Sequence, residues 1–178
     1  MTDRRTGPTE HMKTIANHLA SESRPWKSRR TVLFVCSSGG HLAQLLVLEP
    51  WWADHNTHWV TFDLPDARSR LGEDGFSAAH YPTTRNVVNA ARNYRLAVRV
   101  LGELRPDVVI SNGAGVAVPF FIEARRRRIP TVYLEVYDRV DTPTLTGRLV
   151  APLCTSFLVQ WPQQLESYPG GKLIGALY

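Results

Sequence analysis

The chain has 178 residues and a formal net charge of +5, with 43% hydrophobic and 21% charged residues. This length suits one domain, or one domain with a tail, and it allows an ordinary hydrophobic core. The positive charge favours an anionic partner, either nucleic acid, anionic lipid or a phosphorylated substrate, without choosing among them. The two cysteines, Cys36 and Cys154, form neither a disulfide framework nor a metal-binding spacing, so we expect two buried free thiols.

The first 30 residues are polar and lack the continuous apolar stretch of a signal peptide or a membrane span. Their composition is typical of a flexible arm. We therefore divide the chain into an N-terminal arm, 1–30, and a folded domain, 31–178.

From Thr31 onward, short apolar runs alternate with helical patterns. Strands are expected at 31–36, 58–63, 78–82, 107–111, 131–136 and 156–160, and helices at 41–52, 85–104 and 117–127. Residues 66–75 are polar and turn-like. The alternation predicts an α/β fold with a parallel sheet and helices on both faces.

The helix expected at 85–104 carries two stripes of side chains. The apolar stripe consists of Val87, Ala91, Tyr94, Val98 and Leu101, and the basic stripe of Arg85, Arg92, Arg95 and Arg99. A basic stripe is usually a solvated helix face. The alternative is contact with anionic lipid headgroups or a lipid diphosphate, because apolar and basic side chains run side by side.

Three loops that follow expected strands carry small or polar residues: SSGGH (37–41), SNGAG (111–115) and EVYDRVDTPT (135–144). In a parallel α/β sheet, ligands bind at the carboxyl ends of the strands, near the switch in strand order. We therefore expect the three loops to face one crevice.

The first loop combines Ser38, Gly39 and Gly40 with His41 at the start of a helix. The glycines allow a tight turn, and free N–H groups at a helix start attract anions. The positive end of the helix disfavours a charged imidazole, so His41 is a candidate general base for a sugar hydroxyl. The alternative is that His41 only caps the turn. The loop matches neither the dinucleotide-binding fingerprint nor the P-loop.

The other two loops offer further candidates. Asn112, Gly113 and Gly115 form a second strand-to-helix turn that could contact a diphosphate or sugar. Glu135 and Arg139 could form an ion pair that pins their loop. Alternatively, Glu135 could hold a hydroxyl or orient His41, and Arg139 could meet a diphosphate. None of the histidines at 55, 58 and 80 has a carboxylate or cysteine at ligand spacing, so no metal site is expected.

Together the loops resemble those of the acceptor-side subunits of two-component UDP-sugar glycosyltransferases. The matching stretches, in the order of that family, are SSGGHL (37–42), ISNGAGVAVPF (110–120), YLEVYDRVDTPTLTGRLVAP (133–152) and FLVQWPQQLESYP (157–169). The family includes asparagine-linked-glycosylation subunit fourteen of eukaryotes and PssD-like proteins of bacterial exopolysaccharide synthesis. It is related to the acceptor domain of MurG.

The resemblance implies a Rossmann-like domain that forms the N-terminal, acceptor-binding half of a GT-B glycosyltransferase. A separate donor-binding subunit would supply the other half, and the pair would transfer N-acetylglucosamine or another hexose, with inversion, from a UDP-sugar to a polyprenyl-diphosphate-linked sugar. It also implies His41 and Glu135 as catalytic residues. Ser38, Gly39, Gly40, Asn112, Gly113, Gly115 and Arg139 would bind substrate, with no cofactor and no metal.

Eukaryotic relatives carry an N-terminal membrane helix, whereas residues 1–30 here are polar. A bacterial protein that is cytoplasmic and peripheral on the inner face of an anionic membrane is therefore expected. Two alternatives remain open. The chain is a non-catalytic scaffold that anchors a catalytic partner, or a Rossmann-like domain that binds nucleic acid; the latter is not expected, since aromatic and basic residues are not interleaved.

Overall fold

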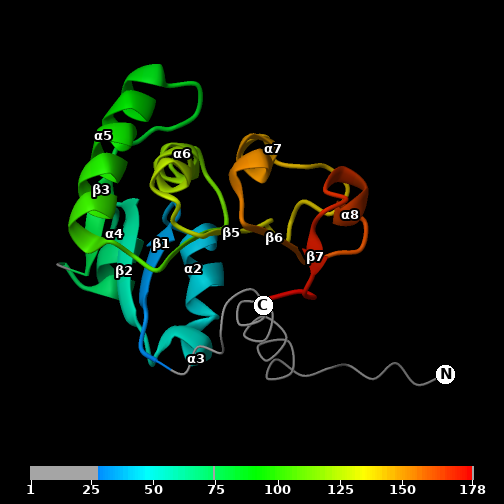
Figure 1. Ribbon diagram of the computed structural model, residues 1–178, viewed down its shortest axis with the longest axis horizontal. Coiled ribbons are helices and arrows are strands. Elements are labelled where there is room, and N and C mark those ends of the chain that lie inside the picture. Colours follow the sequence, from blue (N-terminus) through cyan, green and yellow to red (C-terminus); the bar gives the residue numbers. More distant parts are fainter. Residues whose placement is uncertain (1–27, 74, 178) are drawn as a thin grey trace.

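The computed structural model describes residues 28–73 and 75–177, so all but the last three residues of the expected arm lie outside the described part. The described residues form one parallel sheet with strand order β3-β2-β1-β4-β5-β6-β7 (Figure 1). The strands are β1 Thr31–Val35, β2 Asn56–Phe62, β3 Phe76–Ala79, β4 Val108–Ser111, β5 Thr131–Leu134, β6 Ser156–Val159 and β7 Lys172–Leu173. The six predicted strands are present, with ends that differ by one or two residues in most cases.

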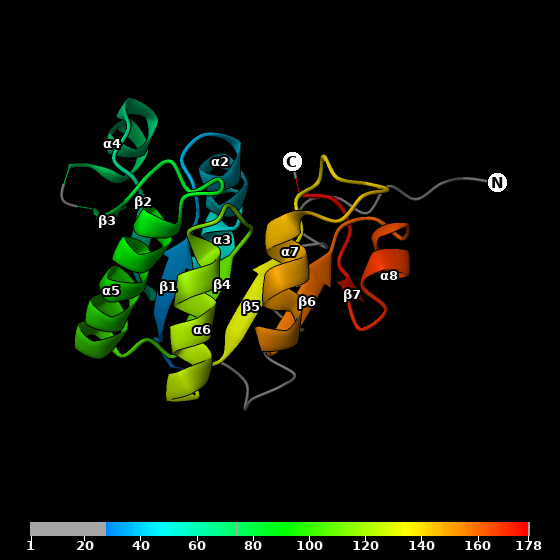
Figure 2. The same cartoon turned by 90° about the horizontal axis from the view of Figure 1, so that it is seen from above.

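Helices cover both faces of the sheet, as predicted. Three of them, α5 (Val87–Leu104), α6 (Ala117–Arg127) and α7 (Leu145–Val150), lie on one face, whereas α2 (Gly40–Leu46) and α3 (Glu49–Trp52) lie on the other (Figures 1 and 2). The remaining helical segments are α4 Pro65–Leu71, the 3-10 turn η1 Ala151–Leu153 and α8 Gln164–Ser167.

Side chains alternate between the two faces of each strand, so the sheet has one core layer on each side. In β1, Leu33 and Val35 pack under α5 and α6, whereas Val32 and Phe34 pack under α2. These side chains are fully buried, which accounts for the continuous apolar run of this strand.

The strand order reverses direction between β1 and β4. From β1 the chain adds β2 and β3 on one side, then returns to place β4 on the other side of β1. The loops after β1 and β4 therefore flank the switch point of the sheet, where doubly wound folds bind their ligands.

The helix predicted at 41–52 is two helices, α2 and α3. Pro50 has no backbone N–H and cannot continue a helix begun at residue 40, but it fits the first turn of a new one. Accordingly α2 ends at Leu46, and α3 starts at Glu49. A similar proline effect was missed at 66–75, where Pro65 and the first-turn acid Asp66 start helix α4 instead of a turn.

The predicted apolar stripe of α5 is not its core face. Val87 and Val98 are exposed, and only Leu101 of the five stripe residues is buried. The buried face instead contains Asn89 and Asn93, followed by Leu96, Ala97, Val100 and Leu101.

The two asparagines concealed the core face of α5 because they are polar in the sequence but paired in the fold. Asn93 accepts the N–H of His80 and donates to its carbonyl, at 2.8 and 2.9 Å, and Asn89 donates to the carbonyl of Pro82 at 3.0 Å. The side chain of Asn86 accepts the N–H of Asn89 and caps the helix. These bonds attach the start of α5 to the segment that follows β3.

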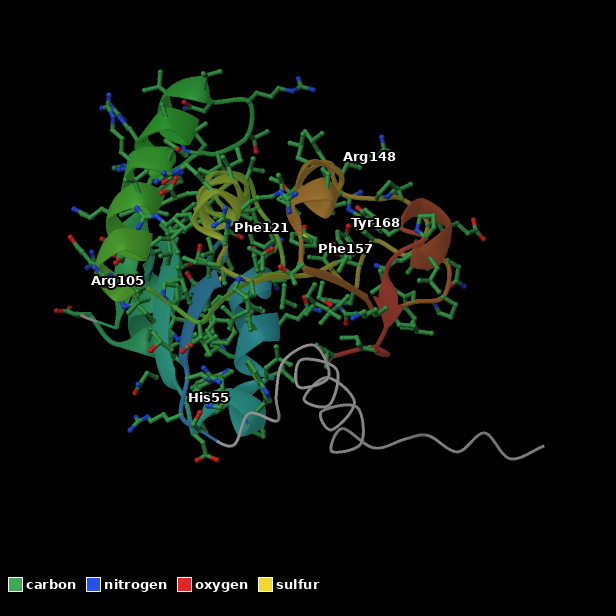
Figure 3. All side chains as sticks on the ribbon, in the orientation of Figure 1. His55, Arg105, Phe121, Arg148, Phe157 and Tyr168 are labelled. Carbon is green, nitrogen blue, oxygen red and sulfur yellow. The ribbon has the colours of Figure 1, made fainter. Side chains whose placement is uncertain are left out.

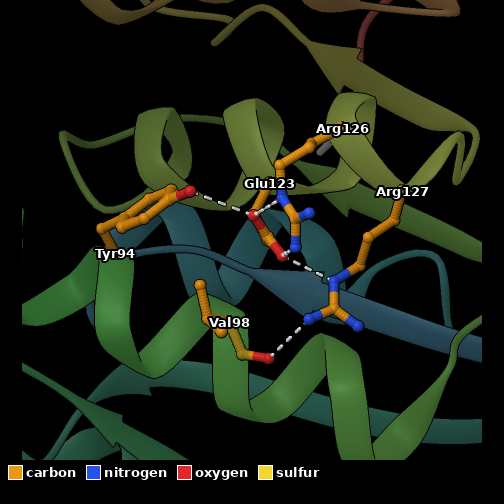
Figure 4. A network of polar contacts seen from close by, with 5 residues as sticks. All are labelled: Tyr94, Val98, Glu123, Arg126 and Arg127. Atoms are coloured by element: carbon orange, nitrogen blue, oxygen red, sulfur yellow. Dashed lines mark hydrogen bonds and ion pairs between the residues drawn. The ribbon is translucent and has the colours of Figure 1, made fainter.

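A buried carboxylate joins α6 to α5 (Figure 4). Glu123 of α6 accepts hydrogen bonds from Arg126 and Arg127, at 2.6–2.7 Å, and from the hydroxyl of Tyr94 on α5 at 3.1 Å. Arg127 also donates to the carbonyl of Val98 on α5 at 3.0 Å. The arginines and the tyrosine lower the pKa of Glu123 to about 2, although burial opposes them.

Candidate functional site

The three loops singled out in the sequence follow β1, β4 and β5, which are neighbours in the sheet. Val35, Ser111 and Tyr133 are aligned across these strands, so the loops leave the sheet at the same level. The three loops thus share one edge of the sheet, as a common crevice would require.

His41 is the second residue of α2 and is held from two sides. Its Nδ1 lies 3.0 Å from the hydroxyl of Ser37, and its backbone carbonyl accepts the side-chain N–H of Asn112 at 2.8 Å. The other ring nitrogen, Nε2, faces Gly113: a Cβ on that glycine would lie 3.0 Å from Nε2 and 3.1 Å from the hydroxyl of Tyr133. The ring therefore sits between the loops after β1 and β4.

Burial lowers the pKa of His41 from its usual 6.5, and the carboxylate of Asp138 partly opposes this shift. The imidazole is therefore mostly neutral at neutral pH, as a general base requires. The prediction that the surroundings disfavour a charged imidazole was right, but the main cause of the lowered pKa is burial rather than the helix dipole. Asp138, in the loop after β5, is a charged neighbour of His41 that sequence reasoning missed.

In the glycine turn after β1, one backbone N–H is already bonded to a carboxylate of the protein. Gly39 has φ +76°, a conformation that favours glycine, and its N–H donates to the carboxylate of Asp66 on α4 at 2.5 Å. Ser38 is half-buried, and Gly39 and Gly40 are exposed. A phosphate oxygen would have to displace Asp66 to reach the N–H of Gly39.

The turn after β4 is tightly packed. Asn112 is buried and also donates to Gln44 of α2 at 3.1 Å. Gly113 has φ +131° and lies against His41, and a Cβ on Gly115 would come within 2.9 Å of Thr83. The glycines at 113 and 115 thus permit close approach of three segments. This packing explains the glycines whether or not they also contact substrate.

Glu135 does not hold the ring of His41, because its carboxylate bonds to other groups. The carboxylate is fully buried and accepts hydrogen bonds from the hydroxyls of Thr144 and Tyr168, at 3.0 and 2.5 Å, and from the N–H of Val136 at 3.1 Å. Its bonds fix the loop that follows β5.

Two residues near Glu135 were missed by sequence reasoning. Gly147 of α7 packs so closely on Glu135 and Tyr168 that no Cβ would fit there. Tyr168 stacks on Phe157 with ring centroids 4.2 Å apart, and Figure 3 shows the two side chains beside each other. Burial, followed by the bond to Glu135, raises the pKa of Tyr168, so it remains a hydrogen-bond donor.

Arg139 is exposed and does not pair with Glu135, so of the two alternatives the ion pair is excluded. The loop is pinned instead by two buried glutamines. Gln164 donates to the carbonyls of Val136 and Arg139, at 2.9 and 3.0 Å, and Gln160 donates to that of Glu135 at 2.8 Å. The guanidinium of Arg139 projects from a loop whose backbone is fixed.

The predicted basic stripe is present in part. Arg92, Arg95 and Arg99 are exposed on α5, whereas Arg85 precedes the helix with φ +50°. Arg92 also donates to Asn89 at 3.2 Å. Exposed apolar side chains lie on the same side of the sheet, namely Val87 and Val88 on α5, Ile122 on α6, and Leu145 and Leu149 on α7.

Among residues 28–73 and 75–177, no three histidine, cysteine or acidic side chains gather as metal ligands would. Within the same ranges, every helix is too short or too polar to cross a bilayer. Of the two thiols, Cys36 is buried as predicted and Cys154 is half-buried, and burial raises the pKa of each to about 12.

The sheet order and its switch point define a Rossmann-like domain of the GT-B type. MurG of Acinetobacter baumannii superposes with a TM-score of 0.61 at 18% identity, over 75% of this chain and 41% of MurG. The UDP-N-acetylglucosamine 2-epimerase of Rickettsia bellii gives 0.63 at 15% identity, over 82% and 43%. At these identities the likeness establishes the fold alone.

The sequence establishes the family. The chain belongs to the family described as "Oligosaccharide biosynthesis protein Alg14 like", which matches residues 9–177. The expected family resemblance is therefore confirmed.

Two relatives indicate the range of this likeness. The UDP-N-acetylglucosamine transferase subunit ALG14 of Yarrowia lipolytica is 30% identical over 153 residues, covering 82% of this chain and 67% of that protein. The human ALG14 subunit is 29% identical over 103 residues, covering 54% and 47%. The chain thus spans two thirds of the yeast relative and about half of the human one.

Proposed function

We propose that this chain is the acceptor-binding subunit of a two-component glycosyltransferase. It binds a polyprenyl-diphosphate-linked sugar and, with a separate donor-binding subunit, transfers N-acetylglucosamine or another hexose from a UDP-sugar. Family membership supports this proposal, because relatives are named as subunits of a UDP-N-acetylglucosamine transferase. The observation that carries it is the position of His41, half-buried at the switch point of the sheet, where burial lowers its pKa.

In the proposed reaction, a hydroxyl oxygen of the acceptor sugar attacks the anomeric carbon of the donor sugar. The bond from that carbon to the phosphate oxygen breaks, and its electron pair leaves with UDP. The Nε2 of His41 takes the hydroxyl proton, and the imidazolium then releases it to water. The UDP-sugar is a substrate, and the proposal includes no cofactor or metal.

The other site residues have binding or shaping roles in this proposal. The loop that contains Ser38, Gly39 and Gly40 and the loop 111–115 border the diphosphate and the acceptor sugar. Arg139 attracts the diphosphate, since a guanidinium matches phosphate oxygens in geometry and charge. Glu135 acts indirectly, because its carboxylate is buried and fixes the loop from which Arg139 projects.

The proposal also places the chain at the cytoplasmic face of an anionic membrane as a peripheral protein. The supporting observation is that exposed arginines of α5 and exposed apolar residues of α5, α6 and α7 share one side of the sheet. Such a combination binds anionic bilayers through both charge and apolar burial.

The test is His41→Ala, assayed together with the donor-binding subunit. Loss of the base is expected to lower kcat about 10²- to 10⁴-fold, with a smaller change in KM. His58→Ala is the matched control, because His58 is also half-buried with a lowered pKa but lies near the start of β2. If His41→Ala folds and retains turnover, the chain is a scaffold that anchors a catalytic partner.

A further inference from the structure

We infer that Ser37 is a positioning residue that holds His41 in the tautomer with its proton on Nδ1. This inference rests on the proposed function only for its effect on turnover, because the tautomer itself is a property of this chain. It assigns a role to a residue that sequence reasoning passed over, four positions before the histidine.

The two ring nitrogens have different surroundings. Nδ1 lies 3.0 Å from the hydroxyl oxygen of Ser37, so this nitrogen is covered by a protein group. Nε2 points towards Gly113, which has no side chain to cover it. Nε2 is therefore the nitrogen on the side of the second loop, where a substrate hydroxyl would approach.

A hydroxyl can either donate to Nδ1 or accept from it, but only one arrangement leaves a base. If Ser37 donated, the single ring proton would be on Nε2, and Nε2 could not accept another. If Ser37 accepts from Nδ1–H, the lone pair is on Nε2. The hydrogen bond from Nδ1–H to Ser37 is also kept when His41 takes up a proton, because both nitrogens of an imidazolium are donors.

The hydroxyl of Tyr133 also faces Gly113, where a Cβ would lie 3.1 Å from it, and this hydroxyl is neutral. The hydroxyl of Thr144 donates to the carboxylate of Glu135, so Thr144 can only accept from Tyr133, at 3.4 Å. Burial raises the pKa of Tyr133 well above its usual value, so that its hydroxyl stays protonated. The carboxylate of Asp138 is the charged group that acts on the ring.

The direct test is the nitrogen spectrum of ¹⁵N-histidine-labelled protein, taken on this chain alone at a pH above the pKa of His41. Two-bond proton–nitrogen correlations distinguish the two tautomers. We expect Nδ1 protonated and Nε2 unprotonated in the wild type. Ser37→Ala is expected to give a mixture of tautomers, and Ser37→Thr, which keeps the hydroxyl, is expected to restore the wild-type pattern.

The second readout is turnover with the donor-binding subunit. Loss of one hydrogen bond predicts a fall in kcat of about 2- to 10-fold for Ser37→Ala, with KM unchanged and with rescue by Ser37→Thr. Ser77→Ala is the matched control, because Ser77 lies 2.9 Å from Nε2 of His58 in the same kind of pair. It is expected to alter the His58 resonances and to leave both the His41 tautomer and turnover unchanged.

Two results would overturn the inference. One is a wild-type spectrum with the proton of His41 on Nε2, or a His41 pattern that Ser37→Ala does not change. The other is an altered tautomer with unchanged turnover in a Ser37→Ala variant of native circular dichroism, when His41→Ala does lose turnover. Failure of the proposed function is distinguishable from both, because it would appear as full turnover in His41→Ala itself.

Discussion

Gly147 shows at the level of one residue how the loop after β5 is supported. It lies on α7 directly against the carboxylate of Glu135 and the hydroxyl of Tyr168, where a side chain has no space. Thr144 caps the same helix by accepting the N–H of Gly147 at 2.9 Å and also donates to Glu135. The start of α7 and the buried acid therefore form one packed unit.

Gly147→Ala is expected to destabilise the protein by about 3 kcal/mol, because the added methyl group must displace Glu135 or Tyr168. Chemical denaturation measures this difference. Gly102→Ala on α5 is the control, since a Cβ there meets only the flexible end of Arg127, at 3.4 Å. It is expected to stabilise by about 0.5–1 kcal/mol through helix propensity. A neutral Gly147→Ala would contradict the close packing of α7 on Glu135.

At the scale of elements, the contact between α5 and α6 depends on a charged centre as well as on apolar packing. The carboxylate of Glu123 is buried between the two helices and bonded to two arginines and a tyrosine (Figure 4). A buried acid of this kind is tolerated only because its partners replace the water that it loses.

Glu123→Gln is expected to reduce the free energy of unfolding at neutral pH by about 2 kcal/mol, since it removes the charged acceptor of these bonds. The folded pKa of about 2 lies below the ordinary 4.5, so the carboxylate stabilises the protein above pH 4.5. That stability is lost as the pH falls from 4.5 through about 2. The difference between wild type and variant should therefore narrow over this range.

Urea titrations at several pH values measure this effect. Arg125→Gln is the control, because Arg125 is exposed on the same helix. It is expected to change stability by less than about 0.5 kcal/mol at every pH. A difference between wild type and Glu123→Gln that stayed constant with pH would show that the stabilisation does not come from the ionised carboxylate.

At the scale of the whole molecule, the two faces of the sheet differ in what they expose. The face covered by α5, α6 and α7 presents arginines and apolar side chains together. The proposed site lies at the carboxyl edge of the same sheet (Figure 2). A membrane bound along these helices would bring a lipid-linked acceptor close to that edge.

Charge reversal tests this orientation. Arg95→Glu with Arg99→Glu is expected to weaken sedimentation with anionic phosphatidylserine vesicles roughly 30-fold, from about 1 kcal/mol for each basic contact. Arg92 is left intact because it bonds to Asn89. The charge-matched control is Arg29→Glu with Arg70→Glu, since both are exposed and lie outside α5, before β1 and on α4. Equal losses in the two variants would assign binding to net charge rather than to this face.

Much of the site could be predicted from sequence because its loops follow strands. Runs such as Val32–Val35 indicate buried strands, and the glycines after them indicate tight turns. The pattern therefore predicted that His41 and Asn112 lie just beyond the carboxyl ends of strands. The core face of α5 could not be predicted in this way, since Asn89 and Asn93 are polar residues with buried partners.

The sequence by itself determined the alternation of strands and helices, the glycine turns and the family to which the chain belongs, because these depend on neighbouring residues and on motif order. Only the tertiary structure decided that Asp66 occupies the N–H of Gly39, and that Glu135 bonds to Tyr168 rather than to His41. These partners are 27 and 33 positions apart, and no local pattern encodes which distant side chain will fill a buried site. The packing of the whole sheet makes that choice.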